Sequence, residues 1–167
     1  RGVVLSALDA DLVAASPVLP AWADLPAAPG RTRTTADRWT LDGSCAYHLL
    51  TYTGRGSVPL ATDVDPVGLD GRAVSAAFRV PGDVLFMHPL DAGHLEYTYR
   101  AATSVRRCVQ DLGTATSTCR SIASTGRRAR VRAERMGDVL VVTVGARVYT
   151  CADDASCRLG RVRLPKR

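Results

Sequence analysis

The sequence contains no asparagine, a single lysine at Lys166 and a single isoleucine at Ile122. Without asparagine the chain carries no acceptor for N-glycosylation, and no asparagine side chain orients a catalytic histidine. Aromatic residues make up only 5% of the chain, which argues against an aromatic platform for stacking nucleic-acid bases. No apolar run approaches the roughly 20 residues of a transmembrane helix, so we expect no membrane-spanning segment.

The residues that are present predict a globular protein. The 167 residues are 46% hydrophobic and 23% charged, which is enough for one domain with a sizeable core. The net charge of +6 comes almost entirely from arginine and favours acidic partners. The chain begins with Arg1 rather than methionine, which predicts a piece cut from a longer polypeptide. No secretory signal is recognisable in the sequence.

Proline spacing divides the chain into an arm and one domain. Residues 1–36 are rich in alanine and proline, and we interpret them as an N-terminal arm or linker with a short helix at Leu5–Ala15. Residues 37–167 are predicted to form a single α+β domain. A helix is expected at about 45–53, followed by a β-rich part over about 80–167.

Turn residues separate the strands expected in the β-rich part. These strands are Asp83–His88, Leu95–Ala102, Asp138–Thr150 with a kink at Gly145, and Arg158–Leu164. Turns are expected at Pro89–Gly93 and Met136–Asp138, and a short helix is expected at 67–78. No internal repeat is evident in the sequence.

One segment has clear chemical content, the run Asp42-Gly43-Ser44-Cys45 before Ala46-Tyr47-His48-Leu49-Leu50. The Gly/Ser turn delivers Cys45 to the first turn of the expected helix. Free backbone N–H groups and the positive end of the helix dipole favour a thiolate at that place. Turn N–H groups also hold an oxyanion. The pattern therefore predicts a cysteine nucleophile.

The stretch DGSCAYHLL resembles the nucleophile motif of OTU-type cysteine proteases, and it is similar to the nucleophile segment of RNA-virus papain-like proteases. The positions that fit the motif are Asp42, Gly43, Ser44, Cys45, Tyr47, His48 and Leu50, whereas Ala46 replaces a bulky residue. The resemblance implies an α+β fold in which a short N-terminal helical part carries the nucleophile and an antiparallel sheet follows.

A cysteine nucleophile needs a base, and His94 is the candidate among three histidines. The segment Gly93-His94 opens a predicted strand and resembles the general-base segment of papain-like and OTU proteases. Residues i and i+2 of a strand share a face, so we expect Glu96 to accept a hydrogen bond from the His94 imidazole. Asp42 is the alternative third member of the site.

The short separation between Cys45 and His94 is closer to that of compact viral leader and accessory proteases than to that of cellular deubiquitinases. The resemblance implies an endopeptidase that needs no cofactor. Its substrate would be a polyprotein junction or a ubiquitin-like tail, and in a viral protein it would act in the host cytoplasm.

The remaining cysteines leave three interpretations open. They form two local pairs, Cys108 with Cys119 and Cys151 with Cys157. The four thiols could ligate one structural zinc, close two disulfides or stay reduced. Disulfides would place the chain outside the cell and favour an alternative function, a secreted β-rich binding module whose basic face meets an acidic partner.

Arginines alternate along Arg128–Arg135, so Arg128, Arg130 and Arg132 are expected on one face of a strand, joined by Arg127 and Arg135. Such a stripe could bind the phosphates of a nucleic acid. Together with a structural zinc, it would indicate a nucleic-acid-binding domain. We favour a solvated face that protects the sheet from aggregation, because no aromatic residues are interleaved with the arginines.

Overall fold

All regular elements in the described part of the computed structural model are β-strands. The structure describes residues 33–42, 45–54, 59–68, 73–126, 129–152 and 157–160. These ranges hold β1 (Arg33–Asp42), β2 (Cys45–Thr53), β3 (Pro59–Gly68), β4 (Phe78–Val80), β5 (Asp83–Pro89), β6 (His94–Arg100), β7 (Ser104–Asp111), β8 (Thr116–Ser124), β9 (Val131–Met136), β10 (Val139–Val144), β11 (Arg147–Cys151) and β12 (Cys157–Gly160). Within these ranges no helix has the length and hydrophobicity needed to cross a membrane.

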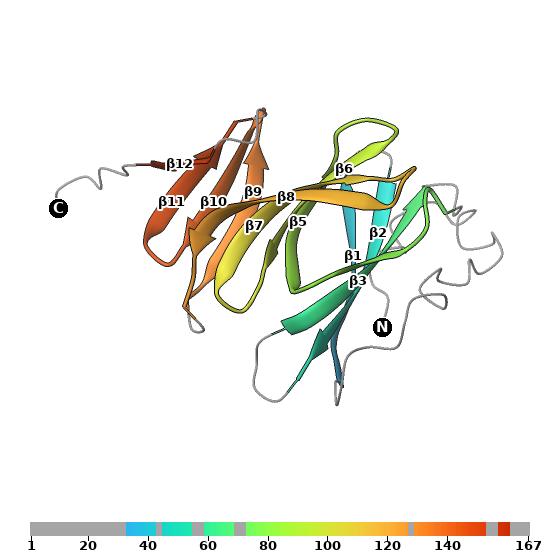
Figure 1. The fold of residues 1–167 in the computed structure, drawn as a ribbon, viewed down its shortest axis with the longest axis horizontal. Helices are drawn as coiled ribbons and strands as arrows, with labels where there is room; N and C mark the ends of the chain where they lie inside the picture. Colours follow the sequence, from blue (N-terminus) through green and yellow to red (C-terminus); the bar gives the residue numbers. More distant parts are fainter. Residues whose placement is uncertain are drawn as a thin grey trace.

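The strands form three four-stranded antiparallel sheets, each built from four consecutive strands (Figure 1). The first sheet is β1–β4, the second is β5–β8 and the third is β9–β12. No internal repeat is evident in the sequence, yet the described part of the structure repeats one four-stranded meander three times. Strand lengths explain the difference, because β4 has 3 residues whereas β8, in the same position of the second sheet, has 9. Unequal strands and turns give no fixed period in the sequence.

The predicted α+β fold with an N-terminal helix is wrong. The segment Cys45–Thr53 is strand β2, which pairs with β1 on one side and with β3 on the other. The adjacent residues Leu49 and Leu50 mimic a helical apolar face, but burial alternates along the strand, with Leu49 and Thr51 buried and Leu50 partly exposed. Tyrosine and threonine dominate the segment and favour a strand.

Two smaller expectations also change. The single kinked strand expected at Asp138–Thr150 is two strands, β10 and β11, because Gly145 adopts a positive φ of 61° in the turn between them. The helix expected at 67–78 is absent from the described residues of that range, which hold the end of β3 and the start of β4. The helix expected at Leu5–Ala15 lies outside the described residues.

The second sheet lies between the other two. One core joins it to the first sheet and is built around Tyr47, Leu49, Leu95, Tyr97 and Tyr99. Another core joins it to the third sheet through Val105, Leu140, Val142, Val144 and Cys151. All residues of β6 from Leu95 to Tyr99 are buried, since both faces of this strand are covered. The residues of β6 still alternate, with Leu95, Tyr97 and Tyr99 in the core with the first sheet and Glu96 on the other face, paired with Arg107 and Arg135.

The sheets fan out from their first strands, since β5 contacts both β1 and β9. A hollow of about 530 Å³ lies at this place and is lined by all three first strands, at Thr40, Leu85–His88 and Ala133–Arg135. Four-stranded meanders that share an axis along their first strands are the arrangement of neighbouring blades in a β-propeller. In this structure the second sheet has a neighbour on each face, and the first and third sheets each pack against it through one core.

A cross-strand link joins the third and fourth strands of every sheet. In the second sheet Cys108 and Cys119 are directly opposite and form a disulfide. In the third sheet Cys151 and Cys157 do the same. In the first sheet the equivalent strands are joined by an ion pair, in which the Arg79 Nε donates to Asp63 Oδ1 over 2.6 Å. The outermost strand of each meander is therefore fixed to its neighbour.

Candidate functional site

A hollow of about 390 Å³ opens between the first and second sheets, beside the turn that joins β5 to β6. Its walls are mainly apolar, and two of the apolar side chains, Val74 and Leu90, are 42% and 43% exposed. The lining residues are Tyr47, Pro66, Val74, Pro89, Leu90, Asp91, Ala92, His94, Leu95 and Leu112. An apolar hollow with few polar groups is the usual form of a binding site.

His94 and Asp91 supply the polar groups of this apolar hollow. The His94 Nδ1 lies 2.9 Å from Asp91 Oδ1 and 3.0 Å from Oδ2. The backbone N–H of Gly93 donates to Asp91 Oδ1 over 2.7 Å. This N–H and then the His94 imidazole lower the pKa of the Asp91 carboxyl. Asp91 thus fixes one ring nitrogen of His94, and Nε2 is left for a ligand.

A second hollow, of about 380 Å³, also has His94 in its lining and follows the hairpin β7–β8. Its lining includes the exposed Arg120 together with Thr116 and Thr118. Asp111 also lines it, but the carboxylate accepts hydrogen bonds from the backbone N–H groups of Gly113 and Thr114. This second hollow therefore offers a cation and hydroxyl groups, whereas the first offers apolar surface.

The structure places the predicted nucleophile at the start of β2. Cys45 pairs with Asp42 across the β1–β2 hairpin and with Gly68 on β3. The side chains of Asp42 and Cys45 lie outside the described part of the structure. Tyr47 follows Cys45 by two residues and lines the apolar hollow together with His94. Strand β2, which begins with Cys45, and strand β6, which begins with His94, therefore meet at one hollow, and the cysteine lies at the start of a strand rather than at a helix N-terminus.

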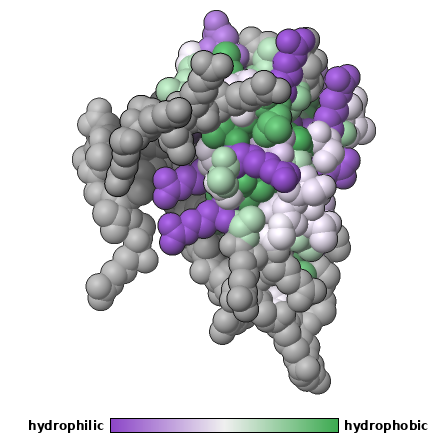
Figure 2. All heavy atoms as spheres, turned by 90° about the vertical axis from the view of Figure 1, so that its left-hand side faces the viewer, coloured by the Kyte–Doolittle hydropathy of each residue, from purple (hydrophilic) through white to green (hydrophobic). Residues whose placement is uncertain are grey.

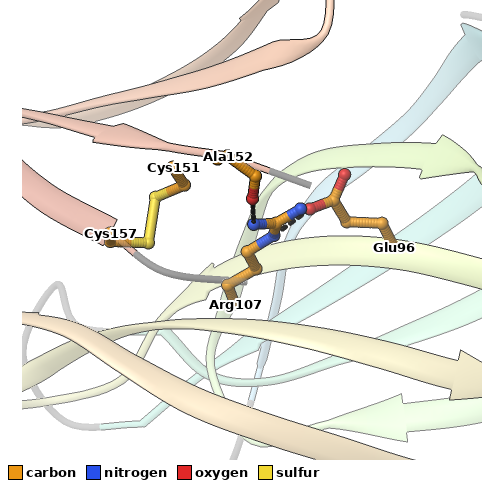
Figure 3. Close-up of a disulfide and its surroundings, with 5 residues drawn as sticks. All are labelled: Glu96, Arg107, Cys151, Ala152 and Cys157. Atoms are coloured by element: carbon orange, nitrogen blue, oxygen red, sulfur yellow. Dashed lines mark hydrogen bonds and ion pairs between the residues drawn. A yellow bond between two sulfur atoms is a disulfide. The ribbon is translucent and has the colours of Figure 1, made fainter. Parts of the chain in front are cut away.

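Glu96 does not orient His94 as expected. It is fully buried between the second and third sheets, where Arg107 Nε donates to Oε1, and Arg135 Nη1 donates to Oε2 over 3.0 Å. Arg107 Nη1 also donates to the carbonyl of Ala152 over 2.5 Å, beside the Cys151–Cys157 disulfide (Figure 3). We call these residues, Glu96, Arg107 and Arg135, the ion cluster. It joins β6 and β7 to the third sheet.

Asp91, Arg107 and Arg135 are partners that the sequence did not lead us to expect. A signal for Asp91 was present, because an aspartate two residues before a glycine is typical of a turn closed by its own side chain. Arg135 was assigned to an exposed arginine stripe, but in β9 it shares a face with Ala133 and Val131, opposite to the face of Arg132. Nothing in the sequence indicates that Arg107 is the buried arginine.

The four late cysteines form the two disulfides, so none of them offers a thiolate to zinc. Zinc was one of three open interpretations for Cys108, Cys119, Cys151 and Cys157, and the structure pairs these cysteines as disulfides instead. Among the described residues no group of three or more histidine, cysteine, aspartate or glutamate side chains is placed to hold a metal ion.

Comparison with known proteins gives no relative of this chain. No protein-family model, no curated protein and no solved structure matches it. A proposal for its function therefore has to rest on the fold and on the two hollows beside His94.

Proposed function

We propose that this chain is a disulfide-stapled β-sheet binding module that holds an acidic polypeptide segment at the two hollows beside His94. The observation that carries the proposal is the position of His94, which lines both the apolar hollow and the arginine-bearing hollow. A polypeptide segment with an apolar residue next to an acidic residue suits both hollows, the apolar residue in the first and the carboxylate in the second. The net charge of +6 also favours an acidic partner.

The apolar hollow supports this proposal through its exposed rim. Val74 and Leu90 together leave apolar surface accessible at the mouth of the hollow. An inserted apolar side chain would bury that surface, which stabilises a complex by about 25 cal/mol for each Å² removed from water. His94 Nε2 at the rim provides a hydrogen bond to the backbone of the same segment.

The second hollow supports an acidic residue in the partner. Arg120 is exposed there, and Thr116 and Thr118 lie on the same face of β8. An arginine guanidinium binds a carboxylate with two parallel hydrogen bonds, and threonine hydroxyls can donate to the same oxygens. Arg107 lines this hollow too, but its guanidinium is bound to Glu96 and Ala152.

The scaffold beneath the hollows is fixed, as a binding site requires. The Cys108–Cys119 disulfide ties β8, which carries Arg120, to β7. The ion cluster ties β6, which begins with His94, to the third sheet. Two disulfides are compatible with an oxidising compartment, and we place the module outside the cell.

Labelled hexapeptides test the binding site by fluorescence anisotropy. The probe has one leucine followed by two aspartates, and the comparison peptides replace the leucine with serine or the aspartates with lysines. We expect the leucine–aspartate peptide to bind most tightly, and we expect Leu90→Asp and Arg120→Glu each to weaken it about tenfold. The control Arg147→Glu changes the same charge on the third sheet and should bind normally. Equal binding of all three peptides, or no loss in Leu90→Asp, contradicts the site.

A cysteine hydrolase is the second candidate, favoured by the approach of β2 and His94 at one hollow. A brief, limiting iodoacetamide pulse without reductant separates the two functions. In a hydrolase Cys45 is labelled rapidly, and His94→Ala slows the labelling, because an activated thiolate depends on its base. The binding module predicts a labelling rate for Cys45 that His94→Ala leaves unchanged, with His88→Ala as the matched control.

A further inference from the structure

The third sheet has an outer face, turned away from the second sheet, that no core residue of the described ranges covers. Leu140, Val142 and Val144 of β10 point into the core with the second sheet. The alternate residues of the same strand lie on the opposite face, and among the described residues they belong to neither core. Val139 on this face is 37% exposed, and Met136 beside it is 64% exposed. Figure 2 shows the side of the molecule on which this sheet lies, with hydrophobic and strongly hydrophilic residues interleaved.

Strand register orders the outer face into rows of directly opposed residues. One row runs Glu134, Val141, Thr150, Arg158 from β9 to β12. The next row runs Arg132, Thr143, Val148, Gly160. The first row thus has an acid at one edge of the sheet, a base at the other edge, and uncharged residues between them. In the second row the single charge lies opposite a glycine at the far edge.

This pattern is complementary to itself. A twofold axis between β10 and β11, parallel to the strands, lays β9 of one copy over β12 of a second copy. Glu134 then faces Arg158 of the second copy, and Val141 faces Thr150. Arg132 faces Gly160, so no like charges oppose each other. The same pairing occurs twice, as in an interface between identical surfaces.

We propose that the outer face of the third sheet is the interface of a dimer of this chain, in which two third sheets pack back to back. Packed sheets align within about 30° at a separation of about 10 Å, which leaves facing rows in register near the axis. The interface continues the stacking that already joins the second sheet to the first and to the third. It is independent of the hollows beside His94, which lie on the second sheet.

Sedimentation equilibrium of the full chain over a range of concentrations tests the dimer. Arg158→Glu and Glu134→Arg each place like charges across the axis, and we expect each to raise the dimer dissociation constant about tenfold or more. The double variant Glu134→Arg with Arg158→Glu restores both pairs with their signs exchanged. Its dissociation constant should return to within about threefold of the unchanged protein.

The matched control is Arg147→Glu, an exposed arginine of β11 that lies on the other face of the sheet. It makes the same charge change as Arg158→Glu and should leave the dissociation constant unchanged. A chain that stays monomeric at every concentration overturns the proposal. So does a double variant that fails to recover the dimer while its unfolding curve matches that of the unchanged protein.

Discussion

Replacing Arg107 with alanine is expected to lower the free energy of unfolding by about 3–5 kcal/mol. Arg107 is 4% exposed and donates to Glu96, which is fully buried. The substitution leaves the Glu96 carboxylate inside the protein with Arg135 alone, and it leaves the Ala152 carbonyl without this donor. Removing one partner of a buried ion pair costs this much because the remaining charge has no water to solvate it. Urea unfolding followed by circular dichroism measures the change.

Arg120→Ala is the matched control for Arg107→Ala. The two arginines are directly opposite each other on β7 and β8, but Arg120 is exposed. Removal of an exposed side chain of this kind changes stability by about 0.5 kcal/mol or less. The loss in the free energy of unfolding caused by Arg135→Ala should lie between those of Arg107→Ala and Arg120→Ala, because the Arg135 side chain is 17% exposed. Equal effects of Arg107→Ala and Arg120→Ala would contradict a buried ion cluster between the second and third sheets.

Removing either disulfide is expected to destabilise the protein by about 2–5 kcal/mol. The closed loops span 11 residues for Cys108–Cys119 and 6 residues for Cys151–Cys157. Chain entropy alone predicts about 3 and about 2 kcal/mol for loops of these lengths. Paired serine substitutions in a Cys45→Ser background, measured by urea unfolding, give both values without thiol exchange at Cys45.

The Cys151–Cys157 disulfide should also be coupled to the ion cluster. Ala152 follows Cys151, and its carbonyl oxygen accepts a hydrogen bond from the Arg107 guanidinium (Figure 3). Combining Arg107→Ala with serine at both Cys151 and Cys157 should therefore cost less than the sum of the separate effects, by about 0.5 kcal/mol or more. Strict additivity would show that the disulfide does not hold the Ala152 carbonyl in place.

The sequence was most informative where turn chemistry dictates the backbone. The turns expected at Pro89–Gly93 and Met136–Asp138 separate real strands, and Gly137 has the positive φ of 61° that such a turn needs. These turn signals depend only on neighbouring residues, so they can be recognised without knowledge of the tertiary structure. The pairing of Cys108 with Cys119 and of Cys151 with Cys157 was one of three open interpretations, because spacing does not distinguish a disulfide from a metal site.

The fold of β2 and the role of Glu96 could not be predicted, because both depend on residues distant in sequence. Leu49 and Leu50 form an adjacent apolar pair that suits a helix, and pairing with the flanking strands β1 and β3 decides for the strand that the tyrosine and threonine residues favour. Glu96 occupies the i+2 position from His94, but Arg107 and Arg135 from two other strands compete for it. A charged guanidinium in a buried site is the stronger partner.

Peptide mapping without reduction tests the disulfide-stapled module most directly. Trypsin cleaves after Arg107, Arg120, Arg147 and Arg158, so each predicted disulfide lies within a single peptide, 108–120 or 148–158. After unfolding with excess iodoacetamide and digestion, we predict both peptides to be unlabelled and two hydrogens lighter than their reduced forms, with label on Cys45. Labelled cysteines in either peptide, or a cross-link between the two peptides, would contradict the stapled sheets on which the binding site rests.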